Sequence, residues 1–471
     1  MKLHAKNLIS LFGFDALVRL LGFVATTYIA RTLGGEGFGL INLGLAVCSY
    51  GIILVSPGLH IIATRIISQA SVEEDLVIRR VTSLRFALAS FALLMVIAVA
   101  LFTIRENVTR WIVILYSASL LPYAFSIDWY FQAKRKLGVI GASRSLSMLA
   151  FIVLLLLFVR SKSDVLFVPA CYFVNILLVS ISMYWIYWKK RAKYIPPEHT
   201  NSAVIEWRTL LGDSIPVGAA NFMGQAVLNF PIILLGICAT SLDIGNFSAA
   251  SKLIFFLLAI DRAIYSLFYP LVARTAASKP ADLGAQISRV LRYLFIVALP
   301  VCIGGLVLAR SIIVLTFGSQ YVASVPLMQI LLFYFLFTVL NSIFAYAVIA
   351  IGNEKRYSAI IVTISLLLLV LLVPLTFYWK ASGASTGMVA GEFFMMALMY
   401  RECRKSVLTP LSLEFMRPLA SSLLMGAVLY ILPISNFFAS LAIGALVYVL
   451  FLLMLKGFTK EDIFFLKERL I

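Results

Sequence analysis

The chain has 471 residues, of which 62% are apolar and only 13% are charged, and its mean hydropathy is +1.01. A water-soluble domain needs far more charge to cover its surface, so this composition excludes a soluble protein and is typical of a helical protein that crosses the membrane many times. The 39 Lys and Arg residues exceed the 21 acids, which gives a net charge of +18.

Apolar runs that are long enough to cross a bilayer recur along the chain. We expect helices, because β-barrel strands would be shorter and would alternate apolar with polar residues. The pattern predicts an all-α polytopic membrane protein with about fourteen transmembrane helices. The predicted spans are Leu8–Ala30, Phe38–Leu59, Val81–Ile104, Trp111–Phe131, Val139–Val159, Val165–Trp188, Leu211–Ala239, Gly245–Val272, Val290–Leu308, Val325–Ile351, Ser358–Tyr378, Ser385–Tyr400, Phe415–Pro433 and Phe437–Leu455.

The basic residues concentrate in alternate connections between these spans. With the N-terminus in the cytoplasm, 28 Lys and Arg, including Arg85 near the start of its span, fall in cytoplasmic connections or close to them, and seven fall in outer ones. Cytoplasmic loops are enriched in Lys and Arg, so both termini are expected in the cytoplasm. All six Trp residues lie at or near predicted span ends, as an interfacial aromatic belt requires. The basic excess is therefore topological, and binding to nucleic acid is not expected.

The connections are too short to hold an extramembrane catalytic domain. The three histidines, His4, His60 and His199, lie in or near connections, and no catalytic set or metal-ligand cluster can be assembled. The five cysteines include no CxxC pair, so neither disulfides nor zinc are expected. The segment Gly34–Gly39 joins two apolar spans rather than a strand to a helix, and we interpret it as a tight turn instead of a phosphate loop. The sequence thus predicts neither an enzyme nor a cofactor.

Two predicted spans carry polar stripes. A charge at the bilayer centre costs roughly 2.5–3.5 kcal/mol, so such residues usually face the interior of a helical bundle. In the first span Asp15 and Arg19 lie one turn apart and can pair. We expect the first and seventh predicted spans to line one water-filled cavity. The alternative is that their polar side chains only form hydrogen bonds between helices. The stripe of the seventh span consists of Asp213, Asn221, Gln225 and Asn229.

The eighth span adds further charges, Lys252, Asp261 and Arg262. Cations from both halves of the chain, Arg19 and Lys252, would suit an anionic substrate such as a phosphate or diphosphate headgroup. Arg262 is a further candidate for substrate binding. The carboxylates that are candidates for coupling H⁺ or Na⁺ to transport are Asp15, Asp261 and Glu392.

Six short motifs are spread along the chain from the first predicted span to the twelfth. They are Arg19-Leu-Leu-Gly-Phe, Ala30-Arg31-Thr-Leu-Gly, Gly37-Phe38-Gly39, Asp128-Trp129-Tyr-Phe-Gln132, Phe317-Gly318-Ser-Gln-Tyr321 and Gly383-Ala-Ser-Thr-Gly387. Together they resemble the polysaccharide-transporter branch of the multidrug/oligosaccharidyl-lipid/polysaccharide exporter superfamily, and within it the Wzx-type flippases of O-antigen repeat units.

The resemblance implies two pseudo-symmetric six-helix lobes around a central cavity, with the last two helices as an extra pair. On this basis we expect an N-lobe over residues 1–205, a C-lobe over 206–405, and a helix pair with a cytoplasmic tail over 406–471. Related lipid II flippases place basic residues where Arg19 and Lys252 stand. Their second cation of the first helix matches Ala25 here, so this cavity is expected to be less basic on that wall.

The function that the resemblance implies is translocation of polyprenyl-diphosphate-linked oligosaccharide from the inner to the outer leaflet of the bacterial cytoplasmic membrane by alternating access. Arg19 and Lys252 would hold the diphosphate, while the Asn and Gln side chains would bind sugar hydroxyls. A polysaccharide polymerase and a chain-length regulator are expected partners. The alternatives are a multidrug exporter of the same superfamily, a membrane-embedded glycosyltransferase or acyltransferase of polysaccharide assembly, and a scaffold in such an assembly.

Overall fold

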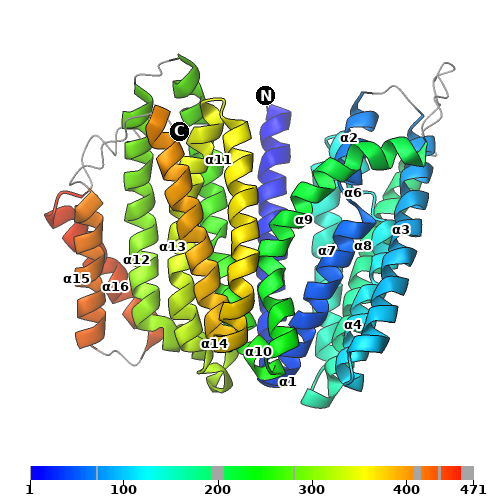
Figure 1. The fold of residues 1–471 in the computed structure, drawn as a ribbon, viewed down its shortest axis with the longest axis horizontal. Coiled ribbons are helices and arrows are strands. Elements are labelled where there is room, and N and C mark those ends of the chain that lie inside the picture. The colour runs from blue at the N-terminus through cyan, green and yellow to red at the C-terminus, as the bar shows by residue number, and fades with distance from the viewer. Residues whose placement is uncertain are drawn as a thin grey trace. The chain divides into compact units, whose positions relative to one another are not determined.

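The computed structural model describes residues 2–69, 73–191, 206–278, 282–406, 415–432 and 436–457. Within these ranges all regular secondary structure is helical (Figure 1). Each predicted span falls on one or more helices, which confirms the all-α expectation, while the number of membrane crossings stays a prediction. The chain forms two compact units, Met1–Gly245 and Asn246–Ile471, which we call the N-terminal and C-terminal units.

The N-terminal unit is a bundle in which α1 contacts α3, α4, α7 and α9. The coil of α9 bends visibly in Figure 1, and this helix contains Pro216 and Pro231, each of which removes a backbone hydrogen bond. The helices of the unit are α1 (Lys2–Val55), α2 (Leu59–Ser68), α3 (Glu74–Thr103), α4 (Asn107–Ala118), α5 (Leu120–Ala124), α6 (Asp128–Ala133), α7 (Leu137–Phe158), the 3₁₀ turn η1 (Lys162–Leu166), α8 (Phe167–Arg191) and α9 (Trp207–Cys238).

The helix α1 contains two predicted spans, and its apolar part Gly13–Val55 has 43 residues. A straight helix of that length would extend about 65 Å, twice the ~30 Å hydrocarbon core of a bilayer. The chain turns at Gly34, where φ is 74° and ψ is 179°, a conformation that glycine adopts without a Cβ clash. Just beyond the turn, a Cβ on Gly39 would collide with the backbone carbonyl of Ser241. The predicted tight turn is confirmed.

The C-terminal unit repeats this arrangement in α14, which contains the eleventh and twelfth predicted spans. Its reversal lies at Lys380, with φ 50° and ψ −128°. A Cβ on Gly383 would collide with the carbonyl of Leu375, so the two arms of α14 are in backbone contact there. The remaining helices of the unit are α11 (Ala259–Ser278), α12 (Leu283–Phe317), the 3₁₀ turn η3 (Ser319–Tyr321), α13 (Ser324–Ala350), α14 (Glu354–Ser406), α15 (Met416–Ile431) and α16 (Phe437–Met454).

The helix α10 (Ser241–Leu257) begins in the N-terminal unit and continues into the C-terminal one. It is separated from α11 by Leu258, so the predicted eighth span is two consecutive helices. The predicted N-lobe ends at residue 205, whereas the N-terminal unit reaches Gly245, because α9 packs against α1 and α2. The lobe boundaries follow pseudo-symmetry rather than packing and stay a prediction.

Candidate functional site

The predicted pair on α1 forms in the structure. The Arg19 Nε donates to the Asp15 Oδ2 at 2.7 Å, and the side chains are 38% and 54% exposed. The opposite face of α1 packs on α7, where a Cβ on Gly141 would overlap Phe14 and where the Tyr28 hydroxyl donates to the carbonyl of Val159 at 2.7 Å. Because Asp15 accepts only from the Nε, the two terminal guanidinium nitrogens of Arg19 donate no hydrogen bond to the described residues and can donate to an anion.

The polar stripe on α9 also lies in the N-terminal unit. Asp213 forms an ion pair with Arg65 of α2 at 3.6 Å, and both side chains are more than half exposed. Asn229 is half-buried. The side chains of Asn221 and Gln225 lie outside the described part of the chain, so their predicted contact with sugar hydroxyls stays a prediction.

Lys252 lies on α10 and is half-buried, next to the buried Ser248 and Ser251 of the same helix. The side chain of Arg262 is outside the described part of the chain. Arg19 belongs to the N-terminal unit and Lys252 to the C-terminal unit. Their meeting around one cavity is therefore still a prediction.

Two of the three candidate coupling carboxylates come together in the C-terminal unit. The Asn341 Nδ2 on α13 donates to the Glu392 Oε1 on α14 at 2.9 Å. Asp261 of α11 lies close enough to Glu392 to interact with it electrostatically. Sequence reasoning missed Asn341, although an amide in the middle of the apolar run Val325–Ile351 is a usable signal. The helices α11, α13 and α14 thus bring two carboxylates and one amide close together inside the unit.

Arg85 is a further residue that sequence reasoning placed wrongly, among the cytoplasmic connections. It lies within α3, and its side chain is only 1% exposed. Its guanidinium donates to the carbonyls of Ser126 at 2.5 Å and Tyr123 at 3.0 Å, and lies 4.9 Å from the Tyr123 ring centre. The Ser126 carbonyl lies in the break between α5 and α6, and the Tyr123 carbonyl, in the last turn of α5, also accepts from the Ser126 N–H. Arg85 therefore donates to backbone acceptors at the end of α5 and in the break that follows it.

The break also carries Asp128, the first residue of α6. Its carboxylate accepts from the Arg144 Nη2 of α7 at 3.0 Å and from the backbone N–H of Trp129 at 3.1 Å. This ion pair joins α6 to α7, so both residues have a structural role.

The described residues contain no group of three or more His, Cys, Asp and Glu side chains that could hold a metal ion. Within the described ranges, eight helices are long and apolar enough to cross a membrane, and polar or charged side chains lie within several of them. This combination defines the class as a polytopic helical membrane protein with polar groups inside its bundle.

Solved structures of transporters have the same fold. The lipid II flippase MurJ in an inward closed conformation matches 94% of this chain and 98% of its own, with a TM-score of 0.72 and 16% sequence identity. An inward-facing multidrug resistance MATE family transporter of the MOP superfamily matches 82% of this chain and 94% of its own, with a TM-score of 0.57 and 15% identity. The predicted fold class is confirmed.

The chain belongs to the polysaccharide biosynthesis protein family, whose profile matches residues 4–276. A relative from Escherichia coli (strain K12) is 26% identical over 424 residues, which cover 86% of this chain and 97% of the relative. One from Shigella dysenteriae is 23% identical over 410 residues, 84% of this chain and 99% of the relative. Both are named "Putative O-antigen transporter", so the predicted family resemblance is confirmed, and the relatives are named as transporters rather than enzymes.

Proposed function

We propose that this protein is a flippase that moves polyprenyl-diphosphate-linked oligosaccharide repeat units from the inner to the outer leaflet of the bacterial cytoplasmic membrane. The observation that carries the proposal is the similarity, over 86% of this chain, to a protein named for O-antigen transport, on a fold shared with a lipid II flippase. Alternating access around a site within the membrane lets a polar oligosaccharide cross while its lipid tail stays in the bilayer.

The proposed headgroup site uses Arg19 and Lys252. The terminal nitrogens of Arg19 can donate two parallel hydrogen bonds to phosphate oxygens while Asp15 holds the side chain through Nε. Lys252 would add a second positive charge, and Arg262 a third. The amide side chains of α9 would donate hydrogen bonds to sugar hydroxyls and accept hydrogen bonds from them, without selecting one sugar. These amides are Asn221, Gln225 and Asn229.

The energy source that we propose is an ion gradient together with the membrane potential. Glu392, with Asn341 and the neighbouring Asp261, offers oxygen ligands within the C-terminal unit that could bind H⁺ or Na⁺. Asp15 is a second candidate, because protonating it would release Arg19. Moving one negative charge outward across 100 mV, inside negative, is favourable by about 2.3 kcal/mol.

The proposed setting is the inner membrane, with both termini in the cytoplasm. Substrate is loaded from the cytoplasmic leaflet and delivered outside, where a polysaccharide polymerase and a chain-length regulator would use it. The multidrug exporter alternative has support from the MATE-like fold. It predicts that the protein changes sensitivity to cationic drugs and that surface polysaccharide does not depend on it.

The test is complementation of a strain that lacks its own repeat-unit flippase, with surface polysaccharide measured. We expect Arg19→Ala and Lys252→Ala each to fail at wild-type expression levels, and Arg19→Lys to restore part of the activity because the charge returns without the planar fork. Arg80→Ala, which removes an exposed cation near the start of α3, is the matched control and should complement. Full restoration by both Ala variants would contradict this headgroup site, and failure of the wild-type protein to complement would contradict the function.

A further inference from the structure

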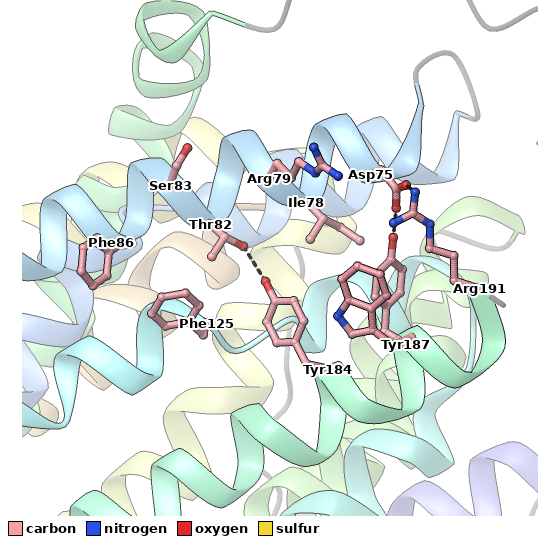
Figure 2. A pocket seen from close by; sticks show the side chains of 11 residues that line it. Asp75, Ile78, Arg79, Thr82, Ser83, Phe86, Phe125, Tyr184, Tyr187 and Arg191 are labelled. Carbon is pink, nitrogen blue, oxygen red and sulfur yellow. Dashed lines mark hydrogen bonds and ion pairs between the residues drawn. The ribbon is translucent and has the colours of Figure 1, made fainter.

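A groove of about 370 Å³ lies between α3 and α8 in the N-terminal unit (Figure 2). Its walls are residues of one face of each helix, spaced three or four apart, and Phe125 from the break after α5. This volume is within the range of small-molecule sites. The residues of α3 that line it are Asp75, Ile78, Arg79, Thr82, Ser83 and Phe86, and those of α8 are Tyr184, Tyr187, Trp188 and Arg191.

The groove is polar at one end and apolar at the other. At the polar end, Asp75 accepts from Tyr187 and pairs with Arg191, as the dashed lines in Figure 2 show. In the middle, the hydroxyls of Thr82 and Tyr184 are 3.1 Å apart and satisfy each other. At the far end, Phe86 and Phe125 are 43% and 40% exposed, and their rings lie 5.5 Å apart.

The polar end carries positive charge that the described residues do not neutralise. Asp75 forms an ion pair with Arg191, and the neighbouring Glu74 forms an ion pair with Lys134. Arg79 lines the groove and forms no ion pair or hydrogen bond with the residues that the structure describes. The site therefore presents one guanidinium that an anion can bind.

We expect the polar end of the groove to lie at the level of the lipid headgroups on the cytoplasmic side. The distribution of Lys and Arg predicts that the start of α3 and the end of α8 lie on the cytoplasmic side. Trp188 is 56% exposed beside the groove, and the Arg191 guanidinium lies 5.4 Å from its ring centre. Such amphipathic rings prefer the headgroup level, so the apolar end of the groove points toward the hydrocarbon.

We propose that this groove is a binding site for an anionic phospholipid of the cytoplasmic leaflet. The phosphate is held by Arg79 and by the polar edge of Trp188, and an acyl chain lies over Phe86 and Phe125. Basic pockets between transmembrane helices on the cytoplasmic side have this chemistry. One available guanidinium fits a headgroup with a single negative charge better than it fits a diphosphate, so the occupant is a membrane phospholipid and not the transported lipid. The inference does not depend on the proposed transport function.

Native mass spectrometry of the purified full-length protein, titrated with phosphatidylglycerol, tests this site. Phosphatidylglycerol should bind more tightly than phosphatidylcholine of the same chains. Arg79→Ala should weaken phosphatidylglycerol binding about fivefold, which corresponds to the loss of roughly one basic contact near an anionic headgroup, and Arg79→Glu should weaken it further. Arg80→Ala, the adjacent exposed cation outside the groove, should leave the affinity unchanged.

A second matched pair tests the aromatic wall. Trp188→Leu should weaken binding, whereas Trp185→Leu, an equally exposed tryptophan of α8 outside the groove, should not. Thermal unfolding of each variant without lipid establishes that it is folded. Equal affinities for the two phospholipids, or equal effects of the Arg79 and Arg80 variants, would overturn the proposal. Tighter binding of a polyprenyl diphosphate than of phosphatidylglycerol, lost in Arg79→Ala, would instead assign the groove to the transported lipid and also overturn it.

Discussion

Replacing Arg85 by Ala is expected to destabilise the N-terminal unit strongly. The substitution leaves the Ser126 carbonyl without its donor, removes one of the two hydrogen bonds to the Tyr123 carbonyl, and opens a cavity where the residue was 1% exposed. Hydrogen bonds to a charged donor contribute about 1.5–3 kcal/mol each, and a large-to-small substitution in a packed core costs about 2–5 kcal/mol. We expect the free energy of unfolding to fall by about 3–5 kcal/mol.

The magnitude can be converted into a melting temperature. For a unit that ends at Gly245, an unfolding entropy of roughly 2.1 cal/mol/K per residue corresponds to about 0.5 kcal/mol/K. The expected decrease in Tm is then about 6–10 °C. Thermal unfolding of the purified protein in detergent, followed by the loss of the monodisperse peak in size-exclusion chromatography, measures it.

One variant separates the charge of Arg85 from its paired hydrogen bonds, and a second serves as a control. Arg85→Lys keeps the charge but one ammonium replaces a fork that spans two carbonyls, so we expect a smaller decrease in Tm. Arg80→Ala changes an exposed cation of the same helix and should shift the free energy of unfolding by no more than about 0.5 kcal/mol. If Arg85→Ala melted within about 1 °C of wild type, the break between α5 and α6 would not depend on this side chain, and the reasoning would be wrong.

Three other substitutions test further contacts. Gly39→Ala places a methyl group against a backbone carbonyl and should abolish the monodisperse peak, whereas Gly13→Ala meets open space and should be tolerated; a normal yield of the first variant would contradict the close contact. Arg144→Ala removes an ion pair with a half-exposed guanidinium and should lower the free energy of unfolding by at most about 1 kcal/mol, so a decrease in Tm of many degrees would argue against this estimate. Glu392→Gln keeps an acceptor for Asn341 and should preserve Tm while removing the dependence of reconstituted transport on an ion gradient; an unchanged dependence would exclude this carboxylate from coupling.

Part of the candidate site could be predicted from the local sequence alone. The pair Asp15–Arg19 is separated by one helical turn, so its ion pair follows from helix geometry alone. The turn at Gly34 was equally predictable, because glycines between two apolar runs mark a reversal. By contrast, Asn341 and Glu392 are 51 positions apart and lie on different helices. Neither residue indicates its partner, because hydropathy and spacing carry no information about which helices pack together.

Arg85 shows the same limit more sharply. Its position within the predicted span Val81–Ile104 was visible, yet a charge count treats a residue near a span end as solvent-facing. Only the tertiary structure shows that α3 passes the break in the fourth span, where the carbonyls of Ser126 and Tyr123 accept from the buried guanidinium.

The sequence by itself determined that this chain is a polytopic helical membrane protein, where its apolar segments lie and which family it resembles. Those properties sum over consecutive residues, since transfer of a segment into hydrocarbon depends on its own side chains. The tertiary structure alone decided that α9 packs with the N-terminal unit, that Arg85 is buried, and that α3 and α8 form a basic groove. These features depend on contacts between segments far apart in the chain, and composition and periodicity do not specify which segments meet.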